Sequence, residues 1–92
     1  MEFIYILTVI KECESEATSV EITPYRNFEA ANEAYSAAVD EARNEFGAAG
    51  TEDEVATDRY RYYSIIDNFS IDKISIELDA KVVHEEYIQG ED

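Results

Sequence analysis

The sequence of 92 residues contains one cysteine, one histidine, one proline, three glycines and no tryptophan. A lone Cys13 cannot form an intramolecular disulfide, so a reducing compartment is expected. Cys13 and His84 are too few, and too far apart in sequence, to supply a set of metal ligands. We therefore expect no metal site, no cofactor, and a cytoplasmic location in a bacterium or an infected host cell.

Basic residues are also scarce, with seven lysines and arginines against 22 aspartates and glutamates. The resulting net charge of −15 is spread along the chain, so the folded body itself is expected to be acidic. Direct binding to nucleic acid through its phosphates needs lysine and arginine and is disfavoured. The excess of negative charge instead serves solubility or complements a basic partner.

Long hydrophobic runs are missing, since no apolar stretch approaches the ~20 residues that span a bilayer. The apolar run at residues 3–10 follows Glu2, without the basic residues and cleavage site of a secretory signal. We expect a strand there and no interaction with a membrane.

Motifs for catalysis are absent too: the sequence has no G-x-S-x-G, no P-loop and no G-x-G-x-x-G. Cys13 lies between two glutamates that raise the pKa of its thiol and weaken it as a nucleophile. His84 is expected to be a half-buried residue at a strand end. The acidic run Glu52, Asp53 and Glu54 lacks the order of an EF-hand loop. We expect a protein that is not an enzyme.

One segment, residues 27–46, has a clear helical period. Its apolar residues recur on a single stripe, which comprises Phe28, Ala31, Tyr35, Ala38, Val39, Ala42 and Phe46. Asn27 is predicted as the N-cap and Gly47 as the residue that ends the helix. A helix with one apolar stripe needs a surface to cover it, and short alternating runs before and after it predict a sheet.

Four strands are predicted, at residues 3–11, 19–23, 59–66 and 74–82, with Pro24 ending the second. The last strand is expected to continue through His84 towards Tyr87, and residues 90–92 to fray. Residues 47–58 are predicted to be a loop, and 67–73 a turn with Phe69 and Ile71 tucked inwards. The fold class is α+β: a single domain over residues 1–92, with two layers in the order β-β-α-β-β. A four-stranded antiparallel sheet carries one helix on one face.

One helix about 28 Å long, at ~1.5 Å per residue, covers only one face of such a sheet. The other face would expose residues of the first strand together with tyrosines of the third. An exposed apolar patch of this kind marks an interface, either between two copies of the chain or with a different protein, unless curvature of the sheet buries part of it.

Aromatic and basic residues gather in the third strand at Tyr60, Arg61, Tyr62 and Tyr63. Such a group is typical of single-strand nucleic-acid platforms, but the charge of −15 opposes that reading. Tyrosine and arginine are also enriched at protein–protein hot spots. We therefore predict that these four residues contact a protein partner.

Carboxylates line the helix away from the apolar stripe. Glu29 and Glu33 are about 6 Å apart along the axis, and Asp40 lies roughly 10 Å further, at ~1.5 Å per residue. Glu41 and Glu45 form a second row on the flank. Rows at this spacing are similar in charge and pitch to the phosphates of a nucleic-acid backbone and fit a basic protein groove. The alternative is that an exposed helix face is simply charged.

In size, charge and layout the chain resembles the small acidic inhibitors that phages and mobile elements carry against restriction and CRISPR systems, many of which are DNA mimics. The resemblance involves no residue motif and implies no functional residue. It implies a non-catalytic protein that inhibits a basic nucleic-acid-binding partner by occupying its basic surface. The alternative is a small homodimeric domain whose acidity serves solubility.

Overall fold

The computed structural model describes residues 2–14 and 16–82. The element order is β1 (Phe3–Cys13), β2 (Glu16–Tyr25), α1 (Phe28–Phe46), a short 3-10 turn η1 (Gly47–Ala49), β3 (Gly50–Ala56), β4 (Tyr60–Asp67) and β5 (Lys73–Val82). The predictions for His84, for a strand continuing towards Tyr87 and for fraying at residues 90–92 fall outside the described residues.

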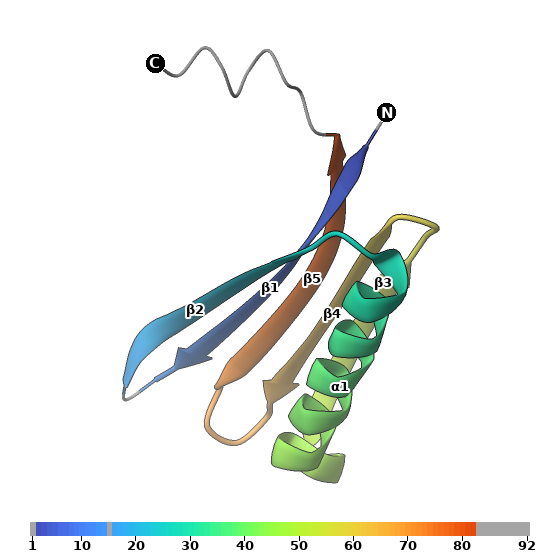
Figure 1. Cartoon of the computed structure of the whole chain (residues 1–92). Coiled ribbons are helices and arrows are strands. Elements are labelled where there is room, and N and C mark those ends of the chain that lie inside the picture. The colour runs from blue at the N-terminus through green and yellow to red at the C-terminus, as the bar shows by residue number, and fades with distance from the viewer. Residues whose placement is uncertain (1, 15, 83–92) are drawn as a thin grey trace.

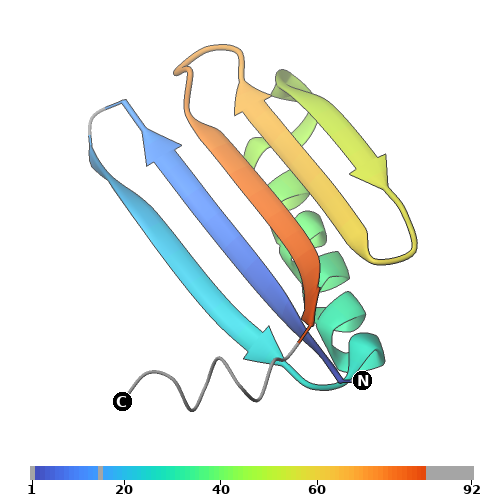
Figure 2. The ribbon, with the colours of Figure 1, turned by 90° about the horizontal axis from the view of Figure 1, so that it is seen from above.

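The strands form one antiparallel sheet in the order β2-β1-β5-β4-β3, with α1 across one face (Figures 1 and 2). The prediction of a two-layer α+β domain with one helix is confirmed. The predicted number of four strands is wrong, because the sheet has five.

The additional strand is β3, in the stretch predicted to be a loop. Among the described strands it pairs only with β4 and forms an edge of the sheet, with Glu52 opposite Ile65 and Val55 opposite Tyr62. Every residue of β3 after Gly50 is exposed, so the strand has no buried side chains to create an alternating hydrophobic pattern. The stretch 47–58 also contains two glycines and the acidic run Glu52, Asp53 and Glu54, which together suggested a loop.

The strand β2 runs from Glu16 to Tyr25, well beyond the predicted residues 19–23. Pro24 does not end it and pairs with Ile6 in the register of β1 and β2. Because β2 is the other edge strand, a residue without an N–H can be accommodated there.

The helix α1 begins and ends as predicted. The side-chain oxygen of Asn27 accepts hydrogen bonds from the N–H groups of Glu29 and Ala30 at 2.7 and 3.1 Å. At the other end Gly47 has φ +61° and donates its N–H to the carbonyl of Arg43. Both ends are fixed by local capping, which is why the sequence located them.

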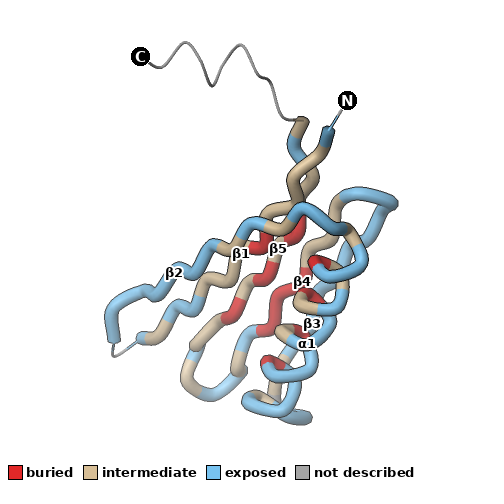
Figure 3. The backbone as a smooth tube through the Cα atoms, viewed as in Figure 1, coloured by how far each residue is buried: buried red, intermediate tan, exposed pale blue. Residues whose placement is uncertain are grey.

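The core lies between α1 and the middle of the sheet, where Figure 3 shows buried segments on β1, β5 and β4. Its largest fully buried side chains are Tyr35, Tyr63, Ile65, Ile76 and Leu78. Within Glu16–Tyr25 of β2, by contrast, no residue is buried. The helix therefore covers the central strands and leaves much of β2 open on the same face.

Candidate functional site

Three carboxylates of α1 point away from the sheet and are named here the outer row: Glu29, Glu33 and Asp40. All three are exposed, and helical periodicity places them opposite the buried positions Tyr35 and Val39. The ion pairs found among residues 2–14 and 16–82 do not include any of them. The outer row thus presents to solvent three carboxylates that form no ion pair with another described residue.

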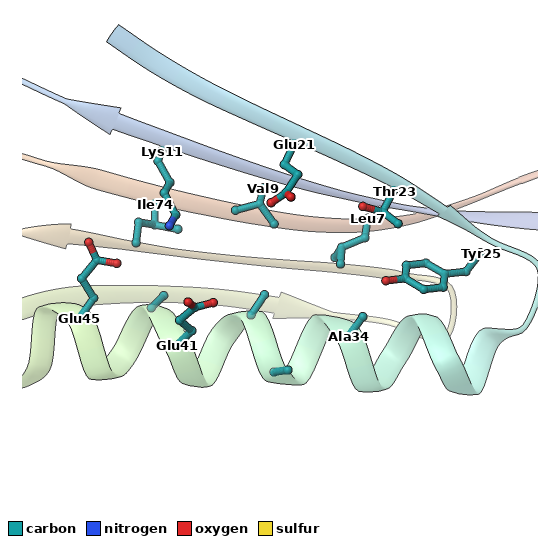
Figure 4. Close-up of a pocket in the computed structure, with 13 residues that line it drawn as sticks. Leu7, Val9, Lys11, Glu21, Thr23, Tyr25, Ala34, Glu41, Glu45 and Ile74 are labelled. Atoms are coloured by element: carbon teal, nitrogen blue, oxygen red, sulfur yellow. The ribbon is translucent and has the colours of Figure 1, made fainter. Parts of the chain in front are cut away.

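The other two predicted helix carboxylates, Glu41 and Glu45, lie on the flank of α1 that faces β1 and β2. Together with Glu21 of β2 they line a groove between the helix and the sheet (Figure 4). The structure therefore divides the five predicted carboxylates into an outer row and a groove pair. The sequence did not reveal the groove, because its existence depends on where the helix sits across the sheet.

The opposite flank of α1 is partly neutralised. The guanidinium of Arg43 pairs with Glu52 at 3.1 Å and with Glu54 at 3.7 Å, and it lies 5.2 Å from the centre of the Tyr63 ring. The hydrogen bond to Glu52 raises the pKa of Arg43. The side chain of Asp53, which is opposite Ser64 in the register, lies on the other face of the sheet from those of Glu52 and Glu54. The three carboxylates of β3 therefore do not meet at one point. Within the described ranges no group of three or more candidate ligands could hold a metal ion.

The four residues predicted as one contact group are divided between the two faces of the sheet. Tyr63 is fully buried beneath α1, so it has no surface with which to contact a partner. Arg61 is half-buried on the same side, with its guanidinium 5.6 Å from the centre of the Tyr35 ring. Tyr60 and Tyr62 are half-buried on the opposite face. Side chains alternate along a strand, so Tyr60 and Tyr62 lie on one face and Arg61 and Tyr63 on the other. The sequence alone does not say which of these faces the helix covers.

Burial also fixes the protonation of the tyrosine beneath Arg61. Burial, followed by the charge of Glu54, raises the pKa of Tyr35 to about 12, so its phenol stays neutral at physiological pH. Burial likewise raises the pKa of Tyr63. These tyrosines therefore belong to the core and do not act as acid–base groups near pH 7.

The face of the sheet away from α1 is named here the open face. Its central strand β5 contributes polar residues such as Glu77 and Asp79, while strands on both sides contribute apolar ones. The most exposed of these apolar side chains are Val20, Ile22 and Val55, at 56%, 63% and 53%. Within the described residues, the open face is therefore an uncovered, partly apolar surface of the kind that marks an interface.

The loop between β4 and β5 presents two further apolar side chains. Phe69 and Ile71 are 87% and 69% exposed, so the prediction that they tuck inwards is wrong. The carboxylate of Asp67 accepts hydrogen bonds from the N–H of Phe69 at 2.8 Å and from the hydroxyl of Ser70 at 3.1 Å. These bonds lower the pKa of Asp67 and hold the loop in a fixed shape.

Ile71 in this loop has φ +63°, a left-handed conformation that β-branched residues rarely adopt. Replacing Ile71 with glycine is expected to raise the free energy of unfolding by about 0.5–1 kcal/mol, the relieved strain less the extra freedom of glycine in the unfolded chain. The exposed Phe69, replaced with serine, is the control and is expected to change stability by less than about 0.5 kcal/mol. Urea denaturation measures both; a loss of stability for Ile71→Gly would contradict the strained conformation.

No protein-family model, no curated protein and no solved structure matches the chain. Cys13 is free and partly buried. Its burial, followed by the negative charges of Asp72 and Glu16, raises the pKa of the thiol. Such a thiol is a weak nucleophile at neutral pH.

The helix of the described part is not long and apolar enough to cross a membrane.

Proposed function

We propose that this chain is a non-catalytic acidic binding protein that inhibits a nucleic-acid-binding protein by occupying its basic surface. The outer row is the observation that supports the proposal most directly. Its three carboxylates are exposed, unpaired in the described structure and arranged along about 16 Å of one rigid helix, at ~1.5 Å per residue. A rigid array of negative charge can take the place of a phosphate backbone in a basic groove.

Several of the few basic side chains interact with groups outside this array. Arg26 pairs with Glu2, and Lys81 pairs with Asp79. The guanidinium carbon of Arg59 lies 4.2 Å from the centre of the Phe3 ring. A single exposed ion pair contributes at most about 1 kcal/mol, but many unpaired carboxylates together steer a basic partner and set the salt dependence of its binding.

The setting that we propose is the cytoplasm of a bacterium or of an infected host cell. There the chain would act as an inhibitor of the type that phages and mobile elements direct against restriction or CRISPR systems. The support is the size, the charge of −15 and the acidic helix on a sheet. The partner would be a basic protein, and neither nucleic acid nor a membrane would be bound directly.

The test is capture of the partner from host lysate on the immobilised chain at low salt. Bound protein is expected to elute with added duplex DNA and at high salt, because the array and DNA would compete for one basic surface. A chain with the outer row replaced by lysines is the control bait and should retain far less of the partner. Captured protein that remains bound in excess DNA would contradict the proposal.

A homodimeric domain without mimicry is the second candidate, and the open face is the observation that favours it. In that case the chain would have a dimer mass in solution and capture no basic protein. Replacing both Val20 and Ile22 with aspartate should then give a folded monomer, since exposed side chains contribute little to stability. Sedimentation velocity measures the mass; a monomer in the unmodified chain would exclude this candidate.

A further inference from the structure

The groove between α1 and the strands β1 and β2 has a volume of about 330 Å³. Leu7 and Val9 of β1 and Ile74 at the start of β5 form its floor, as Figure 4 shows. Leu7 and Ile74 are otherwise buried, at 6% and 3% exposure. The groove is thus an extension of the core that remains open to solvent on one side.

The helix leaves this space because its side chains there are small. Ala34, Ala37 and Ala38 line the wall formed by α1, and Thr23 lines the wall formed by β2. Larger residues at the same helix positions would close the gap against β1. An apolar side chain of another molecule could therefore enter between the two walls without any movement of the backbone.

The rim of the groove is negatively charged on both sides. Glu21 extends from β2 towards the helix, while Glu41 and Glu45 extend from α1 (Figure 4). All three are exposed, and Lys11 is the one basic residue that lines the groove in the described structure. An occupant with positive charges on both sides of an apolar side chain would complement this arrangement.

We propose that the groove binds a segment of the partner in which an apolar side chain is flanked by arginines or lysines. The apolar side chain would lie over Leu7 and Val9, and the flanking cations would pair with Glu21, Glu41 and Glu45. This inference rests on the proposed function, and it assigns a contact that provides specificity in addition to charge. A purely electrostatic array attracts any basic surface, whereas an apolar anchor selects the few that carry one.

Charge decides between this occupant and a second copy of the chain. A second copy has a net charge of −15 and would bring further carboxylates to a rim that already has three against one lysine. The carboxylates of a second copy would be repelled by those of the rim. The apolar floor would stabilise a basic segment equally well, and the basic segment would not be repelled.

The test uses a short synthetic peptide, Arg-Arg-Leu-Arg-Arg, titrated into the isotope-labelled full chain and followed by NMR. The largest amide shifts are expected around the groove, at residues such as Leu7, Val9, Thr23, Ala34 and Ala38. Replacing the leucine of the peptide with serine should weaken binding about tenfold, the scale of one apolar side chain removed from water.

Two protein variants with the same change in net charge separate the groove from the rest of the helix. The variant with Glu41→Lys and Glu45→Lys is expected to bind the peptide about tenfold more weakly, since two close ion pairs become repulsions. The matched variant with Glu29→Lys and Glu33→Lys should bind within about threefold of the unmodified chain, because those residues lie away from the groove.

A third variant, Ala38→Phe, fills the groove without changing its charge and should remove the peptide-induced shifts at the groove. Equal losses in the two charge variants, peptide shifts centred on the outer row, or no binding of the peptide would overturn the proposal. So would concentration-dependent shifts at the groove without peptide, which would identify a second copy as the occupant. Release of the captured partner by DNA tests the proposed function separately, because it depends on the outer row.

Discussion

Replacing Tyr63 with alanine is expected to lower the free energy of unfolding by about 3–5 kcal/mol, whereas the same change at Tyr62 should cost about 1 kcal/mol or less. The two residues are adjacent in β4 and chemically identical. Tyr63 is completely buried beneath α1, while Tyr62 is half-buried on the open face. The pair therefore tests directly which side of the sheet the helix covers.

The large cost at Tyr63 follows from the contacts that the ring would lose. It belongs to the core cluster with Tyr35 and Ile76, and the guanidinium of Arg43 lies over its face. A domain of this kind has a total stability of about 5–15 kcal/mol, so Tyr63→Ala removes a large part of it. Urea denaturation followed by circular dichroism measures both variants. Equal losses at the two positions would contradict the assignment of faces.

Replacing Glu29, Glu33 and Asp40 with lysine is expected to weaken binding to the basic partner by about 100-fold or more. Each reversal turns an attraction into a repulsion, and reversals along one rigid row act on the same basic surface. The net charge changes from −15 to −9. The loss should be largest at low salt, where charges at the surface are least screened.

Stability is expected to change by less than about 1 kcal/mol in this variant. A lysine at position 29 is unfavourable near the positive end of the helix dipole, but a smaller net charge reduces repulsion within the fold. The matched control replaces Glu14, Glu16 and Asp58 with lysine, which gives the same net charge from exposed sites away from the helix. If the control loses binding equally, net charge alone determines the interaction.

The sequence predicted α1 almost completely, because the evidence for a helix is local. The apolar stripe specifies the buried face, Asn27 caps the first turn, and Gly47 ends the last one. The strand β5 was equally easy to predict, since Ile74, Ile76 and Leu78 alternate strictly with polar residues and all three are buried.

The edges of the sheet could not be predicted, because edge strands bury little. Neither β3 after Gly50 nor β2 has any buried residue, so their hydrophobic patterns are weak. Their strand character comes from hairpin pairing with β4 and β1, and a hydrophobic pattern does not reveal that pairing. This is why β3 was missed and β2 was shortened.

The sequence placed three of the candidate carboxylates on the solvent side of the helix, but it did not reveal how the other candidate residues are arranged. Helical spacing placed Glu29, Glu33 and Asp40 on the solvent side, as the exposure of all three shows. The groove beside Glu41 and Glu45, and the burial of Tyr63, depend on the position of α1 across the sheet. That position is decided by packing between distant segments, which a single sequence does not encode in any local pattern.

The most direct test of the central claim is competition with nucleic acid for the captured partner. Labelled duplex DNA is bound to the partner, and its fluorescence anisotropy is followed while the chain is added. We predict that the unmodified chain and the Glu14, Glu16 and Asp58 control displace the DNA, and that the chain with a reversed outer row does not. Anisotropy that stays high or rises with the unmodified chain would show that protein and DNA bind together, and would contradict the account.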